Sequence, residues 1–229
     1  MTPAGTRGPI LVDAIPVDVE ASVGVQRYLR EVLRAVPIDR RGDIVVLSTR
    51  KGRPVLNGIL GYRRSEVPRR PSGPAERVLI QQAAVPVAAA RTGARVVFEP
   101  VDYAAIATRA PIVTCVHSSH INALAGSLGG LHQRYHDVLF PRTLRASRRI
   151  VAISHYAAAQ LRRLDDGQDL VIDVIHHGAG LVDHALAQGG STGGGGLLSV
   201  GTHYDHKEGR SLIQAYAHLL DRWPDAPSL

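Results

Sequence analysis

Short apolar runs alternate with amphipathic stretches along most of the chain, and this alternation predicts an α/β fold. Apolar runs at 9–15 and 43–48 predict buried strands, and the stretch 24–36 between them has the apolar stripe of a helix. A strand, a helix and a strand in this order form a parallel pair with a right-handed crossover. Such continuous apolar strands are typical of a sheet that helices cover on both faces. We therefore predict a doubly wound, Rossmann-like parallel sheet.

The same alternation continues downstream and sets the expected order of elements. The residues 49–74 are rich in Arg, Gly and Pro and predict a surface connection with one short strand at 55–60. Further strands are expected at 95–100, 112–116, 149–153 and 169–175, and helices over 75–91, 131–146 and from Ser154 onward. The helix 75–91 is expected to be interrupted near Pro86, and residues 101–109 to form one or two helical turns.

A glycine-rich segment divides the chain into two unequal parts. The residues 188–196, QGGSTGGGG, have the composition of a flexible linker. The residues 1–187 then form a first α/β domain. The remaining residues, 197–229, hold only a predicted strand at 197–200 and a helix at 208–222. One strand and one helix cannot build a core alone, so we expect an incomplete second α/β domain.

Composition bounds the class of protein. Hydrophobic residues make up 45% of the chain and mean hydropathy is −0.01, so a packed core is expected. Cys115 is the single cysteine, which fits a reducing cytoplasm. The first apolar stretch is broken by Asp13 and Pro16 and does not predict a signal peptide. We expect a cytoplasmic protein, with peripheral attachment to the inner face of the membrane as an alternative.

The net charge of +7 comes almost entirely from arginine, and this positive charge has two interpretations. One is a solvated surface, and the other is attraction to phosphates on a nucleotide or an anionic lipid. The arginine-rich residues 53–70 are the candidate for contact with an anionic membrane or an acidic acceptor. Only 4% of residues are aromatic and none alternate with basic residues, so nucleic acid is not expected as a partner.

Two positions stand where a parallel sheet binds ligands. His117 follows the predicted strand 112–116, and open α/β sheets bind ligands at the carboxyl ends of their strands. A histidine satisfied within the fold is the alternative. Gly24 precedes a helix, where the backbone approaches anions closely, and a plain turn is its alternative. The histidines 176, 177 and 184 match no zinc-binding spacing, so no metal site is predicted.

Five short motifs follow one another along the chain: 24–31 (GVQRYLRE), 111–117 (PIVTCVH), 148–154 (RRIVAIS), 174–178 (VIHHG) and 199–209 (SVGTHYDHKEG). Taken in this order, they resemble motifs of the retaining GT-B glycosyltransferases of family 4. The departures are Val23 where the family often has a second glycine, Ser118 where it has Asp, and His176-His177 where it has Pro-Asn. The donor-binding acidic pair of the family is expected to lie beyond Leu229.

The resemblance implies an activity and a set of site residues. The expected reaction is transfer of a hexose from a nucleotide-sugar to a glycan, lipid or other acceptor, with retention and without a cofactor or bound metal. The residues 1–187 would form the acceptor-side domain, and 197–229 the start of the donor-binding domain. The implied residues are His117 as the catalytic group, Gly24, Lys207 and Gly201 around the donor phosphates, and His120, Arg142, Ser154 and Tyr156 along the cleft.

A second hypothesis belongs to a different class. Because part of the donor site is expected beyond residue 229, the chain would instead be a truncated, non-catalytic remnant or an acceptor-binding module. Such a chain would not bind a nucleotide-sugar tightly.

Overall fold

The computed structural model describes most of the chain, in two compact units. These units are Met1–His177 and Gly178–Leu229. Of the predicted linker, residues 188–195 lie outside the described residues, so the domain boundaries stay predictions. The described residues are 8–16, 23–49, 58–68, 71–72, 74–117, 130–164, 167, 169–178, 196–197, 199 and 209–227.

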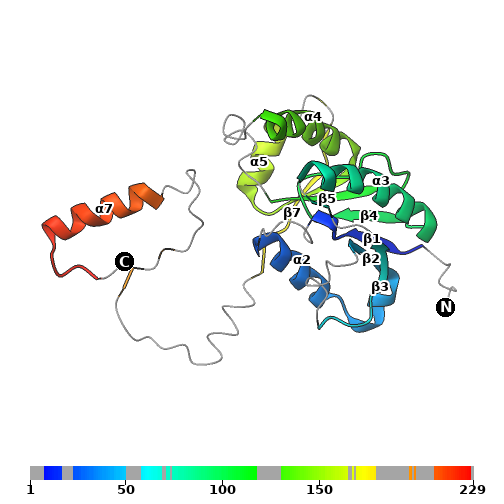
Figure 1. The fold of residues 1–229 in the computed structure, drawn as a ribbon, viewed down its shortest axis with the longest axis horizontal. Coiled ribbons are helices and arrows are strands. Elements are labelled where there is room, and N and C mark those ends of the chain that lie inside the picture. The colour runs from blue at the N-terminus through cyan, green and yellow to red at the C-terminus, as the bar shows by residue number, and fades with distance from the viewer. Residues whose placement is uncertain are drawn as a thin grey trace. The chain divides into compact units, whose positions relative to one another are not determined.

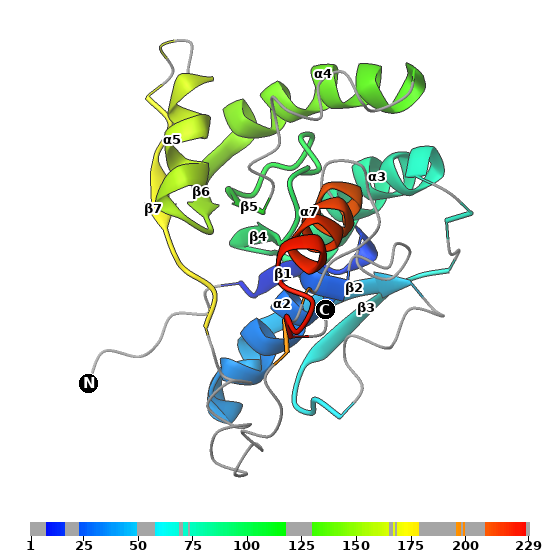
Figure 2. The ribbon, with the colours of Figure 1, turned by 90° about the vertical axis from the view of Figure 1, so that its left-hand side faces the viewer.

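The first unit is built on one sheet of seven parallel strands, in the order β3-β2-β1-β4-β5-β6-β7 (Figure 1). This confirms the predicted doubly wound fold, because the order reverses between β1 and β4. The edges are β3 and β7, which lie at opposite sides of the sheet in Figure 2. The strands are β1 (Ile10–Asp13), β2 (Ile44–Thr49), β3 (Arg63–Val67), β4 (Val96–Glu99), β5 (Ile112–Val116), β6 (Ser147–Ala152) and β7 (Ile172–Val174).

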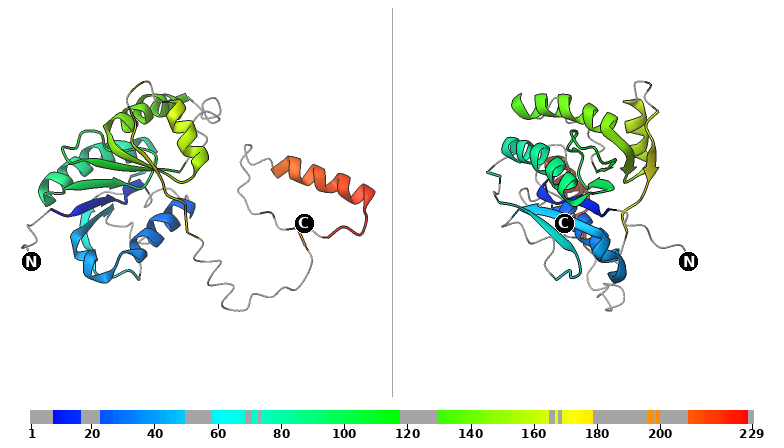
Figure 3. Two further views of the ribbon diagram at one scale, coloured as in Figure 1. Left: turned by 180° about the vertical axis from the view of Figure 1, so that it is seen from behind. Right: turned by 90° about the vertical axis from the view of Figure 1, so that its right-hand side faces the viewer.

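Helices cover both faces of this sheet. In Figures 1 and 3, α2 lies on one side of the sheet, and α3, α4 and α5 lie on the other. The buried clusters agree, since Leu29 and Leu33 of α2 pack with Val12 and Val46, whereas Val85 of α3 packs with strand residues of the opposite face. The helices are α2 (Val23–Ala35), α3 (Pro74–Thr92), α4 (Gly130–Ala146) and α5 (His155–Arg163), with a 3-10 helix, η1 (Ile38–Asp43), before β2.

The two-residue period of the strands assigns each strand residue to one helix layer. In β5, Thr114 and Val116 lie on the face of α3, α4 and α5, and Val116 packs in a cluster with Phe140 of α4. Cys115 lies on the opposite face, toward α2, and His117 follows it there. This alternation decides which helix each residue at the carboxyl edge meets.

The strand β3 is a correction to the predicted surface connection. It pairs with β2 although its sequence, RRSEV, has only one apolar residue, Val67, which is buried. An edge strand needs one neighbour, and charged side chains at an edge discourage pairing with other chains. Arg63 and Arg64 are exposed there, while Arg53 and Arg69-Arg70 lie outside the described residues. The proposed membrane contact of 53–70 therefore stays a prediction.

Two further expectations were wrong. The helix α3 continues through Pro86 because Val85, Ala88 and Ala89 beside it are buried against the sheet, and this burial outweighs the lost backbone hydrogen bond. The residues 101–109 form no helical turn and instead make a loop. Side chains hold this loop: Gln82 donates to the Ala104 carbonyl at 2.8 Å and accepts from the Ile106 amide at 3.1 Å.

The second unit contributes one described helix, α7 (Gly209–Arg222). None of its residues is buried: Leu212 and Ile213 are 40% and 63% exposed, and Leu219 and Leu220 are half-buried. This matches the expected helix at 208–222. Of the predicted strand 197–200, Leu198 and Val200 lie outside the described residues. No helix within the described residues is long and apolar enough to cross a membrane.

Core packing between α2 and the sheet yields a stability prediction. Leu29 is fully buried, so Leu29→Ala should lower the free energy of unfolding by about 2–5 kcal/mol, because it removes apolar contacts and leaves a cavity. Urea denaturation measures the change. The matched control is Ile38→Ala, since Ile38 is 75% exposed and its change should stay below about 0.5 kcal/mol. Equal losses in the two variants would contradict the packing described above.

Candidate functional site

Three aromatic side chains meet beyond the carboxyl ends of β5 and β7. The ring of His117 meets the ring of Tyr28, on α2, edge to face at 4.6 Å between centroids. The ring of His177, which follows β7, stacks on the ring of Tyr28 at 4.9 Å between centroids. Its centroid lies 5.3 Å from that of His117. The Tyr28–His117–His177 group therefore joins three elements at the edge where sheets of this kind bind ligands.

His117 is held at two points by the loop that follows β4. Its backbone amide donates to Oδ1 of Asp102 at 2.7 Å, and its Nε2 lies 2.8 Å from the carbonyl oxygen of Pro100. A carbonyl oxygen only accepts, so Nε2 carries the proton. In the neutral ring, Nδ1 is then the nitrogen with a free lone pair, and it can accept a hydrogen bond from a ligand hydroxyl.

Burial sets the protonation of this group. The pKa of His117 is lowered chiefly by burial and further by His177, while Asp102 and the Pro100 carbonyl oppose this change. Burial also lowers the pKa of His177. Both imidazoles are therefore neutral at pH 7. A neutral His117 offers a hydrogen-bond acceptor to a ligand and not a positive charge.

The Cys115 thiol, which contacts Tyr28, and the Tyr28 hydroxyl itself both keep their protons near neutral pH. The pKa of the Cys115 thiol is raised to about 12, chiefly by burial and to a smaller extent by the charge of Asp102, while a hydrogen bond with Tyr28 opposes this change. Burial is also the main cause that raises the pKa of Tyr28. A thiol in this state is a poor nucleophile, so the site does not support covalent catalysis by Cys115.

Gly24 lies in the first turn of α2, close in sequence to Tyr28. It is exposed, and a Cβ added there would meet no atom within 4 Å. The fold itself therefore does not require glycine at this position. The space beside the backbone is open to a ligand, as the phosphate-binding interpretation requires.

The other predicted site residues are placed apart from this group or lie outside the described residues. Ser154 caps α5, where its Oγ accepts from the Ala157 amide at 3.1 Å. Tyr156 is 62% exposed on α5, and Arg142 is exposed on α4. The ring contacts of the described Tyr28–His117–His177 group include none of these. His120, Gly201 and Lys207 lie outside the described residues.

A second histidine pair lies near this edge. The rings of His155 and His176 are 5.4 Å apart, and both side chains are exposed. Within the described residues, no three of His, Cys, Asp and Glu come together as a metal site would need. The expectation of chemistry without a metal stays a prediction.

Several site residues were not found from the sequence. The sequence did not mark Tyr28 or Pro100 as site residues. Tyr28 belongs to the apolar stripe of the predicted helix 24–36, and Pro100 is the last residue of the predicted strand 95–100. Asp102 follows the strand 95–100 at the same sheet edge, and that position was a usable signal. The sequence marked His177 only as a candidate metal ligand and as a departure from the family's Pro-Asn, whereas the structure shows it stacked on the ring of Tyr28.

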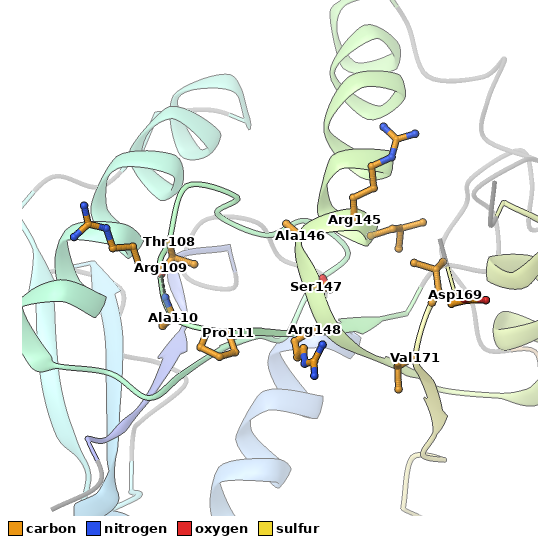
Figure 4. A pocket seen from close by; sticks show the side chains of 12 residues that line it. Thr108, Arg109, Ala110, Pro111, Arg145, Ala146, Ser147, Arg148, Asp169 and Val171 are labelled. Carbon is orange, nitrogen blue, oxygen red and sulfur yellow. Dashed lines mark hydrogen bonds between the residues drawn. The ribbon is translucent and has the colours of Figure 1, made fainter. Parts of the chain in front are cut away.

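A separate hollow lies at the opposite, amino-terminal edge of the sheet (Figure 4). Its volume is about 470 Å³, and Pro111, Ser147 and Arg148 line it. Arg109 and Arg145 also border it, but their side chains point away from each other in Figure 4. Their charges do not converge on one point, so this hollow lacks the clustered donors of an anion site.

Fold and site together define a class. Seven parallel strands in this order, with helices on both faces, form a Rossmann-like α/β fold of the kind found in GT-B proteins. A solved structure of sucrose-phosphate synthase from Thermosynechococcus elongatus has the same fold, with a TM-score of 0.50 and 15% identity over 79% of this chain and 95% of that one. A UDP-GlcNAc 2-epimerase from Methanocaldococcus jannaschii aligns with a TM-score of 0.44 and 13% identity, over 78% of this chain and 47% of that one.

The sequence comparison then gives the family. The profile of Glycosyltransferase Family 4 matches residues 23–181, which is more than half of the chain. The chain therefore belongs to glycosyltransferase family 4. No curated protein sequence matches it.

The charge on Asp102 predicts a measurable change at His117. Asp102→Asn keeps an oxygen that accepts the His117 amide but removes the negative charge, so the pKa of His117 should fall further. Titration of the imidazole by NMR measures it. Asp43→Asn is the control, because Asp43 is exposed and pairs with Arg40 on η1. A higher pKa of His117 in Asp102→Asn would contradict this electrostatic account.

Proposed function

We propose that the chain transfers a hexose from a nucleotide-sugar to a glycan, lipid or other acceptor, with retention of configuration at the anomeric carbon. The bond between that carbon and the diphosphate oxygen breaks, and a bond to the acceptor oxygen forms. The diphosphate leaves with the electrons of the broken bond, so negative charge grows on it, and it takes up the proton that the acceptor hydroxyl gives up. Membership of the family supports this proposal.

The observation that carries the proposal is the state of His117. Its Nε2–H is bound to the Pro100 carbonyl, and burial keeps the ring neutral, so Nδ1 is the nitrogen left to accept a hydrogen bond. Sugars are recognised through their hydroxyl groups, which donate to such an acceptor. We assign His117 the binding of a hydroxyl of the transferred sugar and not the stabilisation of the leaving diphosphate.

Other groups must then stabilise the negative charge that grows on the departing diphosphate. The amides at the start of α2, beside Gly24, fit this need, because a helix N-terminus favours an anion and a Cβ added at Gly24 would meet no atom within 4 Å. Lys207 and Gly201 are proposed for the same diphosphate by resemblance to the family. His120, Arg142, Ser154 and Tyr156 remain proposed residues of the acceptor side.

Donor binding by the chain separates this proposal from the remnant hypothesis. Calorimetric titration with UDP- and GDP-sugars should show micromolar binding. Gly24→Val should lower the affinity about tenfold or more, since its side chain would occupy the space of the phosphates. Gly42→Val is the matched control, because Gly42 also has open space around it. Absence of binding by the unaltered chain would favour a remnant or acceptor-binding module.

Removal of the His117 ring tests the reaction itself. His117→Ala should lower turnover about a hundredfold, because an oriented hydrogen bond to the reacting sugar is lost. Release of nucleoside diphosphate measures the rate, and the anomeric proton of the product, seen by NMR, reports retention. His155→Ala should keep full turnover, since His155 pairs with His176 in the separate pair. Unchanged turnover in His117→Ala would contradict the proposed binding of a sugar hydroxyl by this ring.

A further inference from the structure

Two buried carboxyl groups lie at the ends of adjacent strands, in positions that the proposed reaction does not use. Asp13 ends β1 and Glu99 ends β4, and the register of these strands puts them side by side. Both side chains have 0% exposure. Gln81 of α3 joins them, donating to Asp13 Oδ2 at 2.8 Å and to Glu99 Oε2 at 3.2 Å.

Two neighbouring carboxylates in a dry interior cannot both carry a charge. Burial raises the pKa of Asp13 to about 6, and the pKa of Glu99 is raised well above its usual value by burial and by the charge of Asp13. The groups that oppose this are few. The Ile15 amide donates to Asp13 Oδ1 at 2.9 Å, the Ala105 amide donates to Glu99, and Arg77 of α3 lowers the pKa of Asp13 by its charge. Near neutral pH, Asp13 is ionised and Glu99 holds a proton that it donates to Asp13.

Glu99 also begins the loop that holds His117. The Ala105 amide donates to Glu99 Oε1 at 3.0 Å, which closes residues 99–105 into a compact turn. Gln81 adds a bond to the Tyr103 carbonyl at 3.2 Å, and the Ala104 amide donates to Thr143 Oγ1 of α4 at 3.1 Å. Each of these bonds reaches the loop from the face of α3 and α4.

The same loop meets His117 on the opposite face of the sheet. Both hydrogen bonds of His117 go to loop residues, the amide to Asp102 and Nε2–H to Pro100. Pro100 directly follows Glu99. The carboxyl pair and the imidazole therefore lie on different faces of the sheet and share one seven-residue turn.

We propose that Glu99 is a positioning residue for His117: one proton held between Glu99 and Asp13 keeps the loop 99–105 in the conformation that binds the main chain and the ring of His117. The reason to position His117 rests on the proposed function, but the mechanical link does not. Loss of that proton puts two adjacent charges in a dry site, and the loop must then move to let water reach them. The ring of His117 loses its fixed tautomer as a result.

The sign of the pH dependence follows from the raised pKa of Glu99. The protonated carboxyl is the form that the folded chain favours, so its contribution to stability is present at low pH. It is lost as pH rises through the folded pKa of Glu99. The ordered His117 ring should follow the same course as pH rises.

Glu99→Gln is the informative variant, because a glutamine amide donates to Asp13 and accepts from Ala105 without titrating. It loses only the weak bond from Gln81 to Oε2. Imidazole 15N NMR of the free chain reports the tautomer of His117, assigned by its disappearance in His117→Ala. Unaltered protein should show the Nε2–H tautomer near neutral pH and lose it in alkali. Glu99→Gln should retain it across that range.

Two comparisons complete the test. Glu99→Ala should lose the fixed tautomer at every pH, and if this variant does not fold, the titrations of unaltered protein and Glu99→Gln decide alone. Glu31→Gln is the matched control, with Glu31 exposed on α2 and paired with Arg34, and it should titrate like unaltered protein. A His117 signal that is constant through alkali in unaltered protein, or that changes equally in Glu99→Gln, overturns the inference. The assay needs no substrate. Failure of the chain to bind a nucleotide-sugar would therefore contradict the proposed function and leave the inference about Glu99 unaffected.

Discussion

The structure depends on how it satisfies the polar groups buried where β1, β4 and β5 end. Parallel strands converge there and leave backbone amides and carbonyls that need partners. The loop 99–105 supplies them: Glu99 accepts the Ala105 amide, and Asp102 and Pro100 bind His117. Gln81 and Thr143 hold the same loop from α3 and α4. The functional edge of the sheet is thus built around one hydrogen-bonded turn.

The alternation of strand residues gives this turn two different surroundings. On the face of α3 it meets a buried carboxyl pair, where burial favours protonation. On the face of α2 it meets the Tyr28–His117–His177 group, where burial favours a neutral imidazole. Low dielectric acts in the same sense on both faces, since burial favours the neutral form of Glu99 on one face and of His117 on the other. Asp13 keeps the single negative charge of the carboxyl pair.

Much of the sheet was predictable because its strands are continuous apolar runs and its helices have clear apolar stripes. The exceptions each have a physical cause. The strand 63–67 needed only the edge of β2 and little burial, so its charged sequence gave no strand signal. The helix through Pro86 depends on burial against the sheet, which no local pattern reports. The loop 101–109 is held by side chains from distant helices, so its sequence could not show its conformation.

The sequence by itself determined the order of most strands and helices, the family motifs and the position of His117 at a strand end, because these depend on periodicity and local spacing. Only the tertiary structure decided what His117 contacts. Tyr28, Asp102 and His177 come from three separate segments, and they meet because sheet register and strand alternation bring them to one edge. The pairing of Asp13 with Glu99 was equally hidden, since strands 86 residues apart in sequence become neighbours only in the folded sheet. Contacts of this range depend on topology, and a single sequence does not show them.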